Sequence, residues 1–456
     1  MARTGRARTN AVTRIGGFTL LNPVTTSLVT SREGGAVVDV TATDDATTVE
    51  APATERRRGR RAGLAIGRTL LALVSAMALV AVGVTWFTLD RFKANTNTTS
   101  ALAQVGSEPN QPPADDGATD ILLVGDDSRT DAQGNPLPNS VLKQLRTQFD
   151  AGVNTDTIML LRLPNNGGPT YAVSIPRDSY VAIPGYQTDK INSAYGVMKS
   201  RTAQQLSASG QHDRTTIEQQ STAAGQKALI ETVQDLTGVH IDHYVEVNLY
   251  GFYLLSKAIG GVEVCLKHST SDPDSGSNFH AGTQLVSGAD ALSFVRQRKN
   301  LPSGDLDRIV RQQVFLASAA HKVLSAGTLT SPSALSGLLD ALKKSLVTDP
   351  GLDFTSLVQQ LQGLANGAMT FVTIPVVNSN ARSASGQSIV QVDVNQVHQF
   401  MAALTHPQTA TPPPAHTTKP APTTTATTTT TPATPAATPT NEPTPPVSLD
   451  GVRCVD

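Results

Sequence analysis

The sequence predicts an α/β fold, a three-layer α/β/α domain with a central mixed sheet. Short apolar runs such as "DILLVG" and "TDTIMLLRL" are typical of buried strands, and they alternate with longer amphipathic runs typical of helices. Alternation of this kind builds a sheet covered by helices. Low-complexity sequence near both ends confines the predicted domain to residues 119–406.

The strands and helices follow from periodicity and from turn residues. Strands are expected at 120–125, 155–163, 170–176, 241–248, 262–266 and 369–377. Helices are expected at 226–238, 249–261, 305–325, 335–346, 353–366 and 391–404. Gly238 suits the position just after a helix end, where a left-handed backbone is common.

The region before the domain predicts a single membrane span. No charged residue occurs from Thr69 to Leu89, a length that covers roughly 30 Å as a helix, close to the thickness of a bilayer core. The preceding "RRRGRR" places the N-terminus in the cytoplasm by the positive-inside rule. We therefore expect a disordered basic arm (1–62), a transmembrane helix (63–89), an extracytoplasmic linker (90–118) and an extracytoplasmic domain in the cell membrane.

The region after the domain, 407–456, is rich in Thr and Pro and is expected not to pack. It contains Cys454, and Cys265 lies in the domain. Both would lie outside the membrane, where disulfides persist. We hypothesise that the two cysteines pair and attach the tail to the domain; two free thiols are the alternative.

Charged residues directly follow the predicted strands. Asp127 and Arg129 come after the first strand, Asp156 lies at the start of the second, and Arg177 comes after the third. Ligands of such sheets bind beyond the strand ends. Two carboxylates could hold Mg²⁺ together with substrate phosphates, although an Asp after a strand is also an ordinary turn residue.

A second basic cluster lies in "SFVRQRKNLPSGDLDRIVRQQ". We expect Phe294 to Arg298 to be extended, so that Arg296 and Arg298 point to one side. Arg308 would then approach them from the start of a helix. Two like charges 4 Å apart repel by about 4 kcal/mol near a protein surface, so such a cluster favours a bound polyanion. A solvated surface helix with ordinary salt bridges is the alternative.

These motifs together resemble the LytR-CpsA-Psr family of membrane-anchored cell-wall glycopolymer transferases. The resemblance runs from Asp120 to Thr405 and rests on the order of "DILLVGDDSR", "NTDTIMLL", "VSIPRDSYVAIPG", "DKINSAY", "GGVEVCL", "AGTQLVSGADALSFVRQR" and "GDLDRIVRQQ". It implies a phosphotransferase that moves a glycopolymer from a polyprenyl-pyrophosphate carrier onto peptidoglycan. It also implies an apolar channel for the lipid tail.

The resemblance also implies roles for individual residues. Mg²⁺ would be held by Asp127 and Asp156. Asp305 and Arg308 would be catalytic, with Asp305 orienting Arg308 or acting as base. The pyrophosphate would be bound by Arg177, Arg296, Arg298, Arg308, Gln312, Lys190 and Arg129. Asn154 and Asp307 depart from the family pattern, where Arg and Gly are common.

Two other functions stay open at this point. With water as acceptor, the same site would make a polyprenyl-pyrophosphate phosphatase. A non-enzymatic regulatory or surface protein is the second possibility. A nucleic-acid partner is not expected, because no helix-turn-helix, zinc finger or aromatic stacking platform accompanies the arginine run.

Overall fold

The computed structural model describes residues 97–109, 111–148, 153–325, 332–353, 357, 369–405, 447–448 and 452–456. The predicted arm (1–62), the predicted membrane span (63–89) and most of the predicted helix 353–366 lie outside these ranges. Within the described ranges, no helix has the length and apolar character needed to cross a membrane.

The centre of the fold is a mixed sheet of eight strands in the order β1-β12-β7-β2-β3-β4-β13-β16. Its middle strands are β7 (His243–Val247), β2 (Ala118–Asp126), β3 (Thr155–Pro164), β4 (Thr170–Ser174) and β13 (Met369–Thr373). β2 runs parallel to β7 and antiparallel to β3, and β4 runs parallel to β13. The outer strands are β1 (Asn97–Thr98), β12 (Leu346–Thr348) and β16 (Val447–Ser448).

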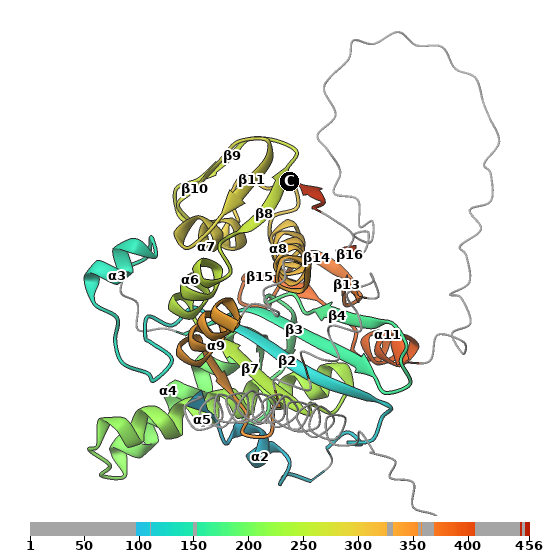
Figure 1. The fold of residues 1–456 in the computed structure, drawn as a ribbon. Coiled ribbons are helices and arrows are strands. Elements are labelled where there is room, and N and C mark those ends of the chain that lie inside the picture. Colours follow the sequence, from blue (N-terminus) through green and yellow to red (C-terminus); the bar gives the residue numbers. More distant parts are fainter. Residues whose placement is uncertain are drawn as a thin grey trace, which may run out of the picture. The chain divides into compact units, whose positions relative to one another are not determined.

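Helices cover both faces of this sheet, as expected (Figure 1). One face carries α2 (Ala101–Val105), α4 (Ser193–Ala208), α5 (Arg214–Thr237) and α11 (Val394–Thr405). The other carries α6 (Leu249–Ala258), α7 (Ala289–Arg296) and α8 (Asp305–Ser325), and α9 (Pro332–Ser345) packs against α6. The side chains of β2 alternate between these layers: Leu122 and Val124 pack toward α5, whereas Ile121 packs toward α7 and α8.

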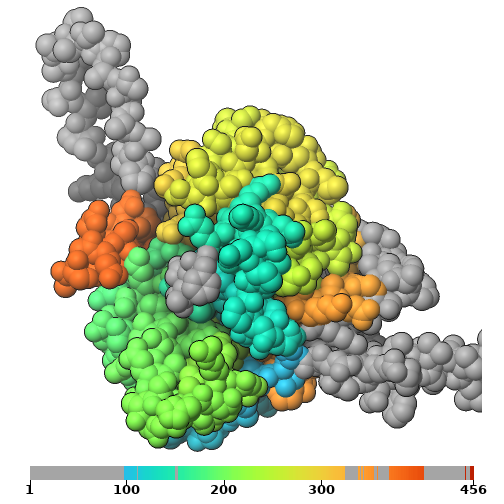
Figure 2. Space-filling view, turned by 90° about the vertical axis from the view of Figure 1, so that its left-hand side faces the viewer, coloured from blue at the N-terminus to red at the C-terminus, as the bar shows by residue number. Residues whose placement is uncertain are grey.

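Short elements surround the sheet. They are α3 (Asn139–Gln144), β5 (Tyr180–Ala182), β6 (Thr188–Lys190), β8 (Val262–Leu266), β9 (Thr270–Asp272), β10 (Ser277–Phe279), β11 (Gly282–Val286), β14 (Asn378–Arg382), β15 (Ser388–Gln391) and β17 (Cys454–Val455). The segment around α3, teal in Figure 2, lies against the yellow segment that contains β10 and α7. Arg146 fixes this contact by an ion pair of 2.7 Å with Asp290 of α7.

The predicted three-layer class and the main strands are confirmed, but some boundaries were wrong. α4 was not predicted, and α5 begins twelve residues before the predicted 226. The predicted linker is folded in part, because β1 pairs with β12, and Ala101 and Val105 of α2 lie in the core beside α5. The apolar contacts of α2 outweigh the polar composition that had suggested a tether.

The end of the chain also packs, against the prediction for 407–456. β16 pairs with β13, and β17 pairs in parallel with β8. The predicted disulfide between Cys265 and Cys454 is present and joins residues 189 apart in sequence. The buried side chains of Val447 and Val455 show why this end folds: they complete the core on the α8 side.

A glycine allows α4 to approach the start of β3. A Cβ atom added at Gly196 would lie 2.0 Å from the carbonyl oxygen of Val153. Close by, the Thr155 amide donates a hydrogen bond of 3.2 Å to the carbonyl of Asn192. A side chain at position 196 would therefore push α4 away from the residues that lead into β3.

We predict that Gly196→Ala lowers the free energy of unfolding by about 2 kcal/mol or more, because backbone must move to relieve the clash. Urea denaturation monitored by circular dichroism measures it. The matched control is Gly337→Ala in α9, where an added Cβ meets nothing within 4 Å. This control should stabilise the protein by up to about 1 kcal/mol, since Ala is the better helix former. Equal effects of the two changes would contradict the explanation.

Candidate active site

Two aspartates meet at one edge of the central sheet. Asp127 directly follows β2, and Asp156 is the second residue of β3. At the Gly125–Asp126 step the partner of β2 shifts from Thr157 to Thr155, which leaves Asp156 as an extra residue in its strand. A bulge of this kind bends the strand and redirects the side chain. The ladder thus brings Asp156 into the neighbourhood of Asp127.

Arg177, which follows β4, and Lys190, at the end of β6, add cations to the same edge. The antiparallel register of β3 and β4, continued past Ser174, carries Arg177 opposite Asp156. The Arg177 guanidinium forms an ion pair with Asp156, and its Nε lies 3.7 Å from Asp178 Oδ1. On the other side of Asp178, Lys190 Nζ lies 3.1 Å from the same oxygen. Cations and carboxylates therefore alternate along the edge.

Asp127 has its own partners. Arg129 Nη1 lies 3.2 Å from Asp127 Oδ2, and the backbone amide of Asn154 donates to Asp127 Oδ1 at 2.7 Å. The Asn154 contact uses the main chain, so the departure from the family pattern at this position leaves the support of Asp127 intact. Arg129 supplies a cation on this side of the site.

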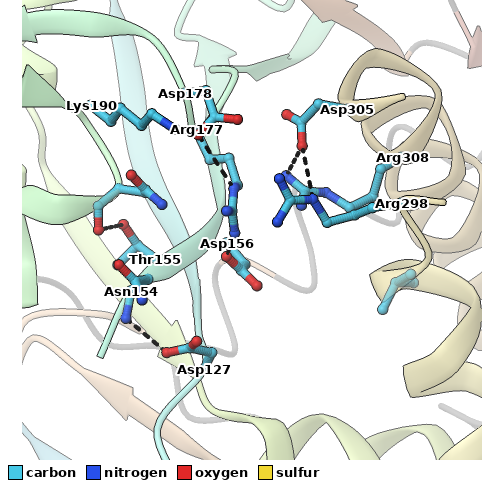
Figure 3. Close-up of polar contacts among 12 residues, drawn as sticks. Asp127, Asn154, Thr155, Asp156, Arg177, Asp178, Lys190, Arg298, Asp305 and Arg308 are labelled. Carbon is cyan, nitrogen blue, oxygen red and sulfur yellow. Dashed lines mark hydrogen bonds and ion pairs between the residues drawn. The ribbon is translucent and has the colours of Figure 1, made fainter. Parts of the chain in front are cut away.

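The helices α7 and α8 bring the remaining cations. Arg308 Nη2 lies 2.6 Å from Asp305 Oδ1, and Arg298 Nε lies 3.9 Å from the same atom. Arg308 is 1% exposed, whereas the Arg298 side chain is 49% exposed. Figure 3 shows these three side chains facing Arg177 and Asp156.

The prediction that Phe294 to Arg298 is extended was wrong. The segment is helical through Arg296, and the chain turns at Gln297, whose ψ is 133°. The helix forms because Phe294 and Val295 are both buried, against the α8 side of the core. Arg296 and Arg298 therefore reach the site from a helix end and from the following loop.

The charges perturb one another strongly. Burial lowers the pKa of the Arg308 and Arg296 guanidiniums, and neighbouring arginines lower both further. Burial also opposes protonation of Arg177, but Asp156, Asp178 and Asp305 outweigh it and raise the pKa of that group. The causes of these pKa shifts link side chains near α7 and α8 with side chains at the sheet edge. This is expected if all of them form one charged cluster.

Two carboxyls of the cluster, Asp305 and Asp127, have raised pKa values. Burial raises the pKa of Asp305, and the charge of Asp178 raises it further, while Arg308 offsets part of the effect. Burial likewise raises the pKa of Asp127, and the nearby Asp156 charge adds to it. A carboxyl disfavoured as an anion becomes more stable when a cation binds beside it.

Several buried donors of this cluster have no hydrogen-bond acceptor among the described residues. They include Arg296 Nη1 and Arg308 Nε. A buried polar group without a partner costs about 1–3 kcal/mol, and a charged group costs more. The site is thus electrostatically prepared for an anion with several oxygen atoms, to which guanidinium groups bind well.

The structure brings together most of the predicted site residues. The cluster contains Asp127, Arg129, Asp156, Arg177, Lys190, Arg296, Arg298, Asp305 and Arg308, with Asp178 in addition. Gln312 is different, because its side-chain amide donates to the carbonyl of Val295 at 3.3 Å. Its contact in this structure joins α8 to α7.

Two carboxylates of the cluster, Asp127 and Asp156, are the candidates for holding a divalent cation. In the part of the chain that the structure describes, no group of three or more His, Cys, Asp or Glu side chains is placed to hold a metal. Mg²⁺, however, is usually held by one or two carboxylates while substrate phosphates and water complete its shell. Asp127 and Asp156 fit that pattern, because the Asp156 charge helps to raise the pKa of Asp127, and a cation bound beside both carboxylates would offset that repulsion.

Comparison with known proteins identifies the family. Residues 86–406 match the model of the LytR_cpsA_psr family, which covers well over half of the chain. The chain belongs to this family. The resemblance of the ordered motifs is thereby confirmed.

The chain is also similar to named cell-wall proteins. Cell wall biosynthesis protein LcpA of Corynebacterium glutamicum is 47% identical over 341 residues, which are 75% of this chain and 66% of LcpA. The polyisoprenyl-teichoic acid–peptidoglycan teichoic acid transferase TagU of Oceanobacillus iheyensis is 28% identical over 63% of this chain and 75% of TagU. The chain matches 66% of LcpA and 49% of the probable cell wall biosynthesis protein LcpB, so less than two thirds of either length.

Solved structures show a more distant likeness. TagV of B. subtilis aligns with a TM-score of 0.45 at 19% identity, over 65% of this chain and 98% of TagV. A LytR-Csp2A-Psr enzyme from Actinomyces oris aligns with a TM-score of 0.43 at 16% identity, over 63% of this chain and 89% of that chain.

Beside the site of this family member lies an acidic centre that the sequence patterns did not predict. Asp126 precedes Asp127 and packs on the opposite face of the sheet, near Glu246 of β7. Glu246 accepts hydrogen bonds from Tyr244 at 2.5 Å and from Gln226 at 2.9 Å. A cavity of about 580 Å³ lies there, with a mixed polar and apolar lining that includes Gln226, Glu246 and Tyr195.

Burial, with the charge of Glu246 as the next cause, raises the pKa of Asp126 to about 8. Between about pH 4 and pH 8 the Asp126 carboxyl therefore stays protonated in the folded state but is ionised in the unfolded state. Its contribution to the free energy of unfolding therefore decreases as the pH rises. We predict that the wild-type free energy of unfolding falls over this range. Asp126→Asn should reduce the fall by more than about 1 kcal/mol. Urea denaturation of wild type and Asp126→Asn at pH 5 and pH 8 tests this. An equal change in the free energy of unfolding in the two proteins would contradict the prediction.

Proposed function

We propose that this chain is a membrane-anchored phosphotransferase that moves a glycopolymer from a polyprenyl-pyrophosphate carrier onto peptidoglycan. The observation that carries the proposal is the set of buried guanidinium donors without acceptors, which faces a pair of carboxylates. This arrangement suits a diphosphate accompanied by a divalent cation. The names of the family relatives LcpA and TagU support a role in cell-wall assembly.

The arginines from the helices and from the sheet edge would hold the diphosphate between them. Arg177 and Arg308 reach into the site from opposite sides and are both largely buried, so their charges are poorly screened by solvent. Their guanidiniums would stabilise the negative charge that grows on the leaving phosphate. Phosphoryl transfer depends mainly on such positioning and charge stabilisation.

Asp127 and Asp156 would hold Mg²⁺, which would neutralise charge on the diphosphate oxygens. To bind the cation, the Asp156 carboxylate would have to loosen its contact with Arg177, and the Asp127 carboxylate would have to loosen its contact with Arg129. Both arginines would then be freed to turn toward the phosphates. The carboxylates thus keep the cations in place until the ligand arrives.

In the transfer itself, the acceptor hydroxyl oxygen forms a bond to the phosphorus that carries the glycan. The bond from this phosphorus to the bridging oxygen breaks, and polyprenyl phosphate leaves with the electron pair. The hydroxyl proton goes to Asp305, because a raised pKa makes its carboxylate a better proton acceptor than an ordinary aspartate. The product is a phosphodiester between glycan and peptidoglycan.

The predicted span at 63–89 would anchor the chain in the cell membrane, with the N-terminus in the cytoplasm. The described part of the chain begins at Asn97, eight residues after Leu89, so the domain would lie beside the outer surface of the membrane. Such a location gives the site access to a lipid-linked substrate.

Arg308→Ala should lower kcat by about 100-fold or more, because a buried donor aimed at the developing charge is lost. Arg308→Lys should recover only part of the activity, since an ammonium keeps the charge but not the planar fork. The assay supplies lipid-linked glycan and peptidoglycan to the full chain in detergent and follows the covalent product. Arg382→Ala, on the exposed hairpin of β14 and β15, is the control.

The same assay separates transfer from hydrolysis. Incorporation of glycan into peptidoglycan supports the proposal. Free glycan phosphate as the sole product, with acceptor present, would instead show a phosphatase. Unchanged transfer by Arg308→Ala would remove the assigned role of the buried arginines.

Chelation of divalent cations should abolish transfer, and added Mg²⁺ should restore it. Asp127→Asn and Asp156→Asn should each raise the Mg²⁺ concentration needed for half-maximal activity by at least about tenfold, because a charged ligand is lost. A Mg²⁺ titration of the activity measures this. Full activity in excess EDTA would show that no divalent cation takes part.

A further inference from the structure

Arg311 lies one turn after Arg308 on α8, but its side chain points elsewhere. It is 0% exposed. Its Nε donates a hydrogen bond of 2.6 Å to the main-chain oxygen of Asp456, and its Nη1 donates at 2.8 Å to Gln297 Oε1. Its guanidinium also lies 5.0 Å above the centre of the Phe294 ring. Arg311 thus joins the end of the described chain to α7.

The Asp456 side of this connection is held firmly. Its carboxylate lies 2.8 Å from Lys267 Nζ and 2.9 Å from His268 Nδ1. Two residues earlier, Cys454 is bonded to Cys265 of β8. The carbonyl that accepts from Arg311 is therefore held near β8 by the disulfide and by the short parallel ladder between β17 and β8. The contacts of the Asp456 carboxylate with Lys267 and His268, which follow β8, add to this.

The Gln297 side leads directly into the site. Gln297 ends α7 and stands between Arg296 and Arg298, two of the cations proposed to bind the diphosphate. Its own amide donates to the Lys299 carbonyl at 3.0 Å and to Thr270 Oγ1 at 2.5 Å. The side chain that Arg311 holds therefore sets the path of the loop that carries Arg298.

We propose that Arg311 is a positioning residue, which uses the disulfide-bonded strand β17 to hold the α7–α8 junction so that Arg296, Arg298 and Arg308 converge on the diphosphate. The inference rests on the proposed function of the site. It explains why a fully buried arginine lies in the site helix and makes no contact with the cluster. It also assigns the folded end of the chain a role in binding, in addition to stability.

The planar geometry of the Arg311 guanidinium explains how this residue can couple β17 to α7. Burial lowers the pKa of Arg311 to about 10, so the group remains charged at neutral pH. A planar guanidinium can donate to two acceptors in fixed directions, which a single ammonium cannot do. The relative positions of β17 and α7 are thereby coupled, and an error of about 1 Å at a binding group can cost up to about 100-fold in rate.

The test measures binding of inorganic pyrophosphate with Mg²⁺ to the full chain by isothermal titration calorimetry. Arg311→Met should weaken binding by about tenfold or more. Arg311→Lys should recover only part of the affinity. Replacing both Cys265 and Cys454 by Ser should act in the same direction as Arg311→Met, because it releases β17 from β8.

The matched control is Arg162→Met. Arg162 is another buried arginine, paired at 2.7 Å with Asp120 on the strands β3 and β2, at the end away from the site. This change should lower the melting temperature as Arg311→Met does, but leave pyrophosphate affinity within about twofold, since Arg162 pairs with Asp116 and Asp120 at the end of β2 and β3 away from the site. Equal losses of affinity in both variants, or none in Arg311→Met, would overturn the proposal.

Hydrogen exchange of the backbone gives a second measurement that does not need a ligand. In Arg311→Met, the amides of residues 296–304 should exchange faster than in wild type, whereas those of 155–164 should not change. If the wild-type chain does not bind pyrophosphate, the proposed function fails, and exchange still decides whether Arg311 holds the junction. Unchanged exchange at 296–304 would refute the positioning role.

Discussion

The structure depends on one electrostatic constraint: several guanidinium groups are removed from water at one edge of the sheet. Each desolvated charge must find an opposite charge, and neighbouring arginines make that need greater. The protein meets it in part with Asp156, Asp178 and Asp305, placed between the cations. The guanidinium donors that have no acceptor among the described residues would account for the proposed binding of a diphosphate.

The same constraint explains the layout of the fold around the site. Segments at the strand ends supply Asp127, Arg129, Asp156 and Arg177. Arg296, Asp305 and Arg308 come from α7 and α8, in the helical layer above the sheet, and Arg298 comes from the loop between these helices. Because the two groups belong to different layers, the site exists only when the layers are correctly packed. The apolar contacts beneath α8, such as those of Val314 and Phe315, are therefore part of what positions the charges.

Much of this could be predicted from the sequence, and the exceptions have physical causes. Buried strands and polar residues at their ends follow from local patterns, which is why Asp127, Asp156 and Arg177 were found. The bulge at Asp156 depends on the register between two strands, and no local pattern encodes it. The helical state of Phe294 to Arg296 reflects burial of Phe294 against distant elements. The partner of Arg311 lies 145 residues further along the chain, so its role could not be seen before folding.

The pairing of Cys265 with Cys454 changes the covalent topology of the chain. The Thr- and Pro-rich stretch lies in sequence between α11 and β16, so it is attached to the domain at both of its ends. A peptide bond cut within that stretch would divide the polypeptide into two pieces that remain joined through sulfur. Proteolysis there would therefore open a ring without shedding the fragment that contains β17.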